Sequence, residues 1–158
     1  MRSIYLDSNI LIAYYSPHKS ERTKRELVQN ALQVFASATD VWLCTSAWAV
    51  TEMVNILISS KKMDPAKVAE VEHRLFTESF GGLKVRVLDV SPVQDYKFSN
   101  FFNDVRMAIL SYHSGVGDVI HSVIMKNNGI DHILTFDEKN DFKQIPGLTV
   151  FHPKDIKL

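Results

Sequence analysis

Short apolar runs alternate along the 158-residue chain with longer stretches in which apolar residues recur every three to four positions. The short runs are rich in β-branched and aromatic residues and predict strands over residues 3–6, 41–45, 85–90, 132–136 and 148–151. The longer stretches predict helices over residues 20–37, 47–60, 64–82, 91–115 and 117–129. Strands that alternate with helices need crossover connections, so we expect a mainly parallel sheet of about five strands flanked by helices. This α/β fold would form one domain over residues 1–158, a length that suits a single domain.

A capping residue followed by proline predicts where two of these helices begin. Asp64 precedes Pro65, and Ser91 precedes Pro92 in the same way. A glycine pair is expected to end the helix that starts at Asp64. Helical spacing in the stretch 20–37 predicts a core-facing side made of Leu27, Ala31, Val34 and Phe35.

The long stretch 91–115 is unusually aromatic. Its aromatic residues are Tyr96, Phe98, Phe101, Phe102 and Tyr112. The three phenylalanines share helical spacing, which favours packing in the core. A dimer or partner surface is the alternative.

Composition is that of an ordinary globular protein, with 46% hydrophobic and 23% charged residues. Lys plus Arg equals Asp plus Glu, so the chain lacks the basic excess typical of nucleic-acid binding, although a bound metal could supply local positive charge. Cys44 is the single cysteine, which excludes an intrachain disulfide and favours a reducing compartment. No stretch resembles a signal peptide or a membrane span, so we expect a cytoplasmic protein with no membrane partner.

Four acidic residues stand where the predicted fold would gather them. Asp7 follows the first strand, Glu52 lies in the helix after the second, Asp118 opens the helix before the fourth, and Asp137 follows the fourth strand. Each has a simpler explanation alone: a helix cap, a solvated helix residue, a favourable charge at a helix start, or a turn. The carboxyl ends of parallel strands share one edge of the sheet, however, so all four could meet there.

Clustered carboxylates repel one another unless protons or cations neutralise them. We therefore expect at least one of the four to have a raised pKa in the folded protein. Oxygen ligands suit Mg²⁺ or Mn²⁺, and a site of this kind typically hydrolyses phosphodiester bonds. The four carboxylates thus predict a metal site with nuclease chemistry.

Four stretches of the chain, "IYLDSNILI", "TEMVNIL", "GDVIHSVIMKNNGIDHILTFD" and "NDF", resemble PIN-domain ribonucleases of the kind that includes VapC-like toxins. The resemblance spans essentially the whole chain in order. It implies an endoribonuclease that depends on Mg²⁺ (or Mn²⁺) and acts as the toxin of a type II toxin–antitoxin system. The implied partners are an RNA substrate, a small DNA-binding antitoxin and a second copy of the chain in a homodimer.

The family's functional residues can be matched to this sequence one by one. The resemblance assigns catalysis and metal binding to Asp7, Glu52, Asp118 and Asp137. Supporting roles next to these acids fall to Ser8, Asn9 and Thr135, and Asp141 is a candidate extra acid. Candidate phosphate contacts, which could equally be solvated surface, are Lys61, Lys62, Lys139 and Lys143.

Other readings of the same residues are weaker. The six histidines, among them His113 and His121, lack zinc-site spacing and are expected to be isolated surface or core residues. "GVGDVI" lacks the ending of a phosphate loop and predicts a turn into a helix. Two functional alternatives stay open: a stand-alone PIN nuclease in RNA processing, and a non-catalytic module that binds RNA or protein.

Overall fold

The computed structural model describes residues 2–137 and 141–157 of the chain. Within them, five strands pair in parallel into one sheet with the order β3-β2-β1-β4-β5. The strands are β1 (Arg2–Leu6), β2 (Val41–Ser46), β3 (Val85–Leu88), β4 (His132–Leu134) and β5 (Thr149–Phe151). The α-helices are α1 (Ser8–Tyr15), α2 (Arg22–Ser37), α3 (Ala47–Ser59), α4 (Pro65–Thr77), α5 (Phe98–Tyr112) and α6 (Val116–Asn127). Short 3-10 helices are η1 (Lys19–Glu21), η2 (Asp141–Gln144) and η3 (Pro153–Asp155). The predicted parallel α/β fold is confirmed.

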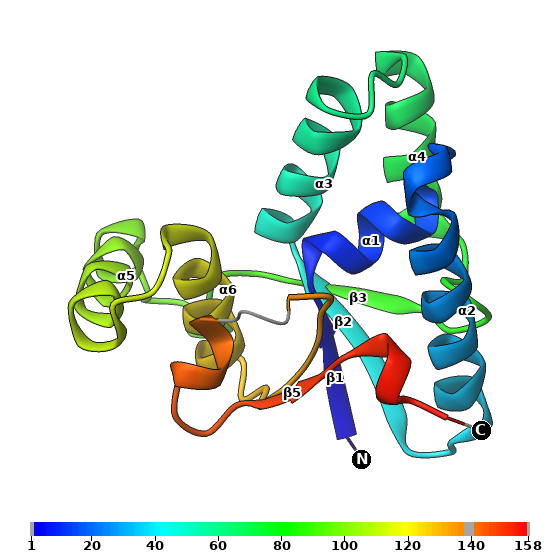
Figure 1. Cartoon of the computed structure of the whole chain (residues 1–158). Helices are drawn as coiled ribbons and strands as arrows, with labels where there is room; N and C mark the ends of the chain where they lie inside the picture. Colours follow the sequence, from blue (N-terminus) through cyan, green and yellow to red (C-terminus); the bar gives the residue numbers. More distant parts are fainter. Residues whose placement is uncertain (1, 138–140, 158) are drawn as a thin grey trace.

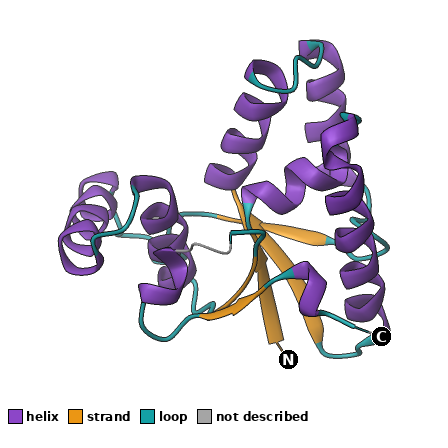
Figure 2. Ribbon diagram, viewed as in Figure 1, coloured by secondary structure: helices purple, strands orange, loops and turns teal. Residues whose placement is uncertain are grey.

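Helices cover both faces of the sheet, as Figure 2 shows. In Figure 1, α5 and α6 lie on one side and α1 and α2 on the other, while α3 and α4 extend beyond the carboxyl ends of β1 and β2. Side chains along β1 alternate between the two helical layers: Ile4 and Leu6 pack against α1 to α4, whereas Tyr5 packs against α5 and α6. Because the second half of β1 is buried on both faces, its sequence there is a continuous apolar run rather than an alternating one.

The strand order places β1 in the middle of the sheet. β2 and β3 follow on one side of it, and β4 and β5 lie on the other. The order therefore reverses between β1 and β4, and ligands of open parallel sheets bind in the crevice outside the carboxyl ends at such a point. Asp7 directly follows β1, and Thr135 directly follows β4.

The core-facing side of α2 differs from the predicted one at two of its four residues. Ala31 and Phe35 are buried as expected, but Val28 and Leu32 complete the buried face. Leu27 and Val34 are only half-buried. α2 packs against both α1 and η3, which rotates its buried stripe relative to the one that spacing alone favours.

The start of α5 was predicted wrongly. Ser91 does not cap a helix, because its hydroxyl accepts a hydrogen bond from the amide of Val93 and holds a local turn instead. The helix begins at Phe98, and the side chain of Asn100 accepts from the amide of Lys97 at its start. The cap at Asp64 is confirmed, since its carboxylate accepts from the amide of Ala66. α4 nevertheless ends at Thr77, before the glycine pair.

The aromatic residues of α5 divide between core and surface. Phe101 is buried against α6, as core packing predicts. Phe98 and Phe102 are 70% and 51% exposed, so the prediction of core packing is wrong for these two. The reason is that α5 lies at the outer side of α6, its main packing partner among the described residues.

Cys44 is buried in the sheet, as predicted for a small apolar side chain. Burial raises the pKa of its thiol to about 12, so the nucleophilic thiolate is absent at neutral pH. No helix among residues 2–137 and 141–157 is long and apolar enough to cross a membrane.

Candidate active site

Asp7 occupies the centre of the carboxyl edge of the sheet and is almost fully buried. Its amide donates to the carbonyl of Leu134, which ties the end of β1 to the end of β4. Its carboxylate Oδ1 accepts from the amide of Ser8 at 2.7 Å and so caps α1. Asp7 therefore is a helix cap, and its second oxygen is left to face the neighbouring strand.

That second oxygen joins a hydrogen-bond network between α1 and the segment after β4. Asp7 Oδ2 accepts from Asn9 Nδ2 at 2.8 Å and from Thr135 Oγ1 at 2.7 Å. Asn9 Oδ1 in turn accepts from the amide of Phe136, and Thr135 Oγ1 accepts from the amide of Asp137. These bonds hold the Asp7 carboxylate in one orientation. The amide of Thr135 still donates to the carbonyl of Phe151, and only the following amides, of Phe136 and Asp137, bond to side chains, so the pairing with β5 stops there.

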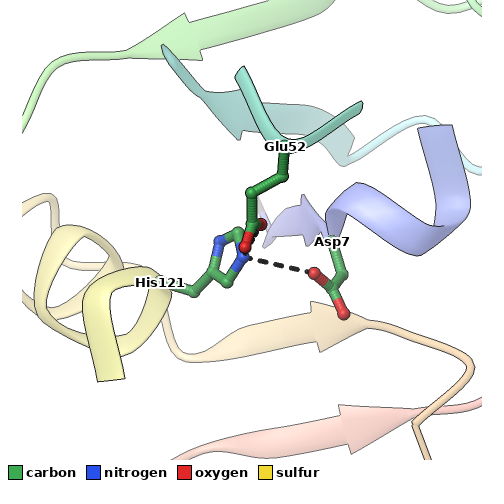
Figure 3. Close-up of side chains that lie close together, drawn as sticks. All are labelled: Asp7, Glu52 and His121. Atoms are coloured by element: carbon green, nitrogen blue, oxygen red, sulfur yellow. Dashed lines mark hydrogen bonds and ion pairs between the residues drawn. The ribbon is translucent and has the colours of Figure 1, made fainter. Parts of the chain in front are cut away.

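Glu52 and His121 reach Asp7 from two different helices, as Figure 3 shows. Glu52 comes from the middle of α3 and is partly exposed, whereas His121 comes from α6 and is 2% exposed. His121 Nε2 lies 2.7 Å from Glu52 Oε2 and 3.4 Å from Asp7 Oδ1. The ring nitrogen thus stands between the two carboxylates.

His121 was not predicted as a site residue, and its expected place as an isolated histidine is wrong. It lies three residues after Asp118, and residues three apart share a face of a helix. That spacing was the signal available in the sequence. The absence of zinc-motif spacing does not bear on this role, because His121 lies next to carboxylates from distant parts of the chain.

The other ring nitrogen of His121 is held by a buried tyrosine. The hydroxyl of Tyr5 lies 2.7 Å from His121 Nδ1 and 2.6 Å from Ser46 Oγ. Ser46 Oγ also accepts from the amide of Ala49 and so caps α3, the helix that carries Glu52. A chain of hydrogen bonds therefore runs from the start of α3 through β1 to the centre of the site.

The pKa values of Asp7 and His121 are both raised at this site, for different reasons. Burial raises the pKa of Asp7, against the lowering effects of His121, Thr135 and Ser8, and the charge of Glu52 adds a smaller increase. The expected raised pKa is confirmed, but burial outweighs repulsion between acids as its cause. Burial lowers the pKa of His121, yet its hydrogen bond to Glu52 and the negative charges of Asp7, Glu52 and Asp118 raise it above its ordinary value.

Without metal, the protein is expected to lose stability as the pH rises through neutrality. A histidine whose folded pKa exceeds its unfolded value of about 6.5 stabilises the fold fully below that pH and progressively less as the pH rises through the folded pKa. The raised pKa of Asp7 acts with the same sign from lower pH upward. Urea unfolding in chelator between pH 5.5 and 8.5 measures this, and His121→Gln should flatten the slope. A stability that is constant or rises over this range would contradict the prediction.

Asp118 and Asp137 stand close to this centre without joining it. Within the described chain, the ligand atoms that lie within 4.8 Å of one another come from Asp7, Glu52 and His121. Asp118 is half-buried one turn before His121 on α6, and its charge raises the pKa of that histidine. The amide of Asp137 donates to Thr135, while its side chain is half-buried. Their metal-binding roles stay predictions.

The first turn of α6 lies directly against Glu52. A Cβ atom on Gly117 would stand 3.3 Å from Glu52 Oε1, which is tighter than an ordinary contact. The bare backbone at this position therefore leaves room for the carboxylate.

The candidate phosphate contacts have different surroundings. Lys61 Nζ lies 2.6 Å from Glu21 Oε1, in a largely buried ion pair at the far end of α3. Lys62 and Lys143 are exposed. Lys139 and the side chain of Asp141 lie outside the described residues, and the neighbouring Phe142 is fully buried. The ion pair gives Lys61 a structural task, and the phosphate contacts stay predictions.

The central group is chemically suited to a divalent cation. Asp7 and Glu52 offer carboxylate oxygens and His121 offers a nitrogen, all within 4.8 Å. Asp7 is buried with its oxygens held in place, whereas Glu52 is partly open to solvent. A cation bound here would be fixed by the buried side and accessible to a ligand from the other.

Comparisons with known proteins agree with this architecture. Three solved structures share the fold over at least 92% of this chain. VapBC2 from Rickettsia felis, bound to a DNA fragment from its promoter, has a TM-score of 0.65 at 16% identity, covering 95% of this chain and 98% of that one. VapC20 from Mycobacterium tuberculosis, a Sarcin-Ricin loop cleaving toxin, has a TM-score of 0.61 at 15% identity and covers 92% and 96%. FitAB bound to the IR36 DNA fragment has a TM-score of 0.51 at 19% identity and covers 95% and 94%.

No curated protein matches the chain at a significant level. A family model does: the model of the PIN domain matches residues 4–148, from within the first strand to the residue before the last strand. With that match spanning nearly the whole sheet and its helices, the chain belongs to the PIN domain family.

Proposed function

We propose that the protein is a metal-dependent endoribonuclease that hydrolyses phosphodiester bonds in RNA. The observation that carries the proposal is the buried carboxylate of Asp7 at the strand-order reversal, with Glu52 and His121 converging on it from two helices. Open parallel sheets form their catalytic sites at such a reversal of strand order. Within residues 2–137 and 141–157, these three residues form the group whose side chains could hold a metal ion.

Different residues would have different roles in this metal-dependent site. Asp7 and Glu52 would hold Mg²⁺ or Mn²⁺, with Asp118 and Asp137 completing the acidic surroundings. The bound cation would polarise a water molecule and offset the negative charge of the scissile phosphate. Thr135 and Asn9 orient the Asp7 carboxylate through their hydrogen bonds, so only small shifts would be needed when a cation binds. Since the chain has no net charge, the cation also supplies the attraction that a basic surface would otherwise give to RNA.

We further propose that this nuclease is the toxin of a toxin–antitoxin pair. Support comes from the structural neighbours, because VapC20 is a toxin that cleaves the Sarcin-Ricin loop, and VapBC2 and FitAB are DNA-bound. The cognate partner would be a small DNA-binding antitoxin, and the toxin would form a homodimer and act on RNA in the cytoplasm. A stand-alone PIN nuclease and a non-catalytic binding module are the alternatives.

Incubation of the purified chain with single-stranded and stem-loop RNA tests the nuclease proposal. We expect internal cleavage in Mg²⁺ or Mn²⁺, none in excess chelator, and recovery when metal is returned. Cleavage undiminished by chelator would contradict the proposal, and RNA binding without cleavage would favour the non-catalytic module. Growth arrest on expression, relieved by a small neighbouring reading frame, separates the toxin from a stand-alone nuclease.

A further inference from the structure

We propose that His121 is a nitrogen ligand of the metal site, which makes the site prefer Mn²⁺ over Mg²⁺. The inference rests on the proposed metal-dependent function and concerns which cation the site selects. The sequence predicted a site made of oxygen ligands alone, and the structure adds a buried imidazole at its centre.

The position of His121 Nε2 fits a ligand atom. Two ligand atoms bound at right angles to a cation at about 2.1 Å stand about 3 Å apart. His121 Nε2 lies 2.7 Å from Glu52 Oε2 and 3.4 Å from Asp7 Oδ1, one spacing just below and one just above that value. Small shifts of the side chains would therefore admit a cation among the three atoms. The ring is 2% exposed, so its lone pair has no competing contact with bulk water.

Tyr5 and Ser46 supply the hydrogen-bond partner that a ligating imidazole needs. When His121 Nδ1 carries the proton, it donates to Tyr5 Oη, and the Tyr5 hydroxyl donates onward to Ser46 Oγ. His121 Nε2 then presents a lone pair toward Asp7 and Glu52. Hydroxyl groups can reverse donor and acceptor roles, so the same chain also serves the metal-free state, in which Nε2 carries a proton and donates to Glu52. Metal-ligating histidines generally have such a partner on the second nitrogen.

Ligand type decides which cation this site favours. Mg²⁺ strongly prefers oxygen ligands, whereas imidazole suits first-row transition metals better. A site of two carboxylates and one imidazole should therefore bind Mn²⁺ more tightly than Mg²⁺. Loss of the imidazole should remove most of this discrimination, because only carboxylate ligands would remain.

Pulsed electron paramagnetic resonance of the Mn²⁺-loaded protein tests the proposal directly. We expect the wild type to show the ¹⁴N modulation of a directly bound imidazole, and His121→Gln to bind Mn²⁺ without it. Tyr5→Phe should keep the nitrogen signal and weaken Mn²⁺ affinity about 10- to 100-fold, the usual effect of losing the partner of a ligating histidine. His73→Gln, an exposed position on α4, is the matched control and should change neither signal nor affinity.

The wild-type spectrum is decisive even if His121→Gln does not fold. Mn²⁺ bound at this site without a nitrogen signal would overturn the proposal and leave the metal-dependent nuclease standing. No Mn²⁺ binding by the wild type at millimolar concentration would overturn both. Equal affinity for Mn²⁺ and Mg²⁺ in calorimetric titrations would also contradict the proposed preference.

Discussion

Asp7→Asn is expected to lower RNA cleavage by about 100-fold or more, because a metal site supplies several kcal/mol of transition-state stabilisation and each 1.36 kcal/mol is tenfold in rate. The amide loses one negative charge and one of the two oxygens that the site holds in place. Initial rates of cleavage at saturating Mn²⁺ measure the effect.

The same substitution separates the two tasks of Asp7. Asparagine caps helices about as well as aspartate, so α1 should keep its start and the circular dichroism spectrum should be unchanged. Asp95→Asn, at an exposed position before α5, is the matched control and should cleave like the wild type. If Asp7→Asn kept wild-type turnover, Asp7 would be a helix cap alone and the nuclease site would lie elsewhere.

Lys61→Met is expected to lower the free energy of unfolding by about 3 kcal/mol, a typical result of removing one partner of a buried ion pair. The side chains of Lys61 and Glu21 are 18% and 8% exposed, and the pair joins the end of α3 to η1. Methionine keeps most of the aliphatic stem, so the loss reports mainly the uncompensated charge of Glu21. Urea unfolding at neutral pH measures it.

Two further variants make this test specific. Lys62→Met, at the exposed neighbouring position, should change stability little. Adding Glu21→Gln to Lys61→Met should restore most of the lost stability, because no buried charge then remains. A loss below 1 kcal/mol in the single variant would contradict the structural role. If the folded Lys61→Met protein also cleaved RNA more slowly, Lys61 would be a phosphate contact as well.

Much of the fold followed from patterns that are local in the sequence. The strand before Asp7 and the helix cap at Asp64 each depend on residues adjacent in the sequence, and the structure confirms both predictions. The parallel pairing of the strands followed from their alternation with helices, which requires crossover connections. The position of Asp7 at the carboxyl edge came directly from these two inferences.

The features that the sequence did not predict depend on distant parts of the chain. The exposed faces of Phe98 and Phe102 follow from the outer position of α5, which helical spacing does not contain. His121 belongs to the site because its ring meets Tyr5, 116 residues away, and Glu52, 69 residues away. Contacts between such distant residues produce no sequence motif of fixed spacing. The only local signal for His121 is its position three residues after Asp118 on the same helix.

Gly117, in the first turn of α6, is a position where a stabilising substitution would disturb the candidate site. Alanine in place of helical glycine usually gains about 1 kcal/mol, so the first turn of α6 would be an obvious place for a stabilising change. Here the added methyl group would stand 3.3 Å from Glu52 Oε1, so the carboxylate whose other oxygen contacts His121 would have to shift by a few tenths of an ångström. Under the proposed function, the glycine at the start of α6 would exchange helix stability for space at the active site, as many enzymes exchange stability for activity.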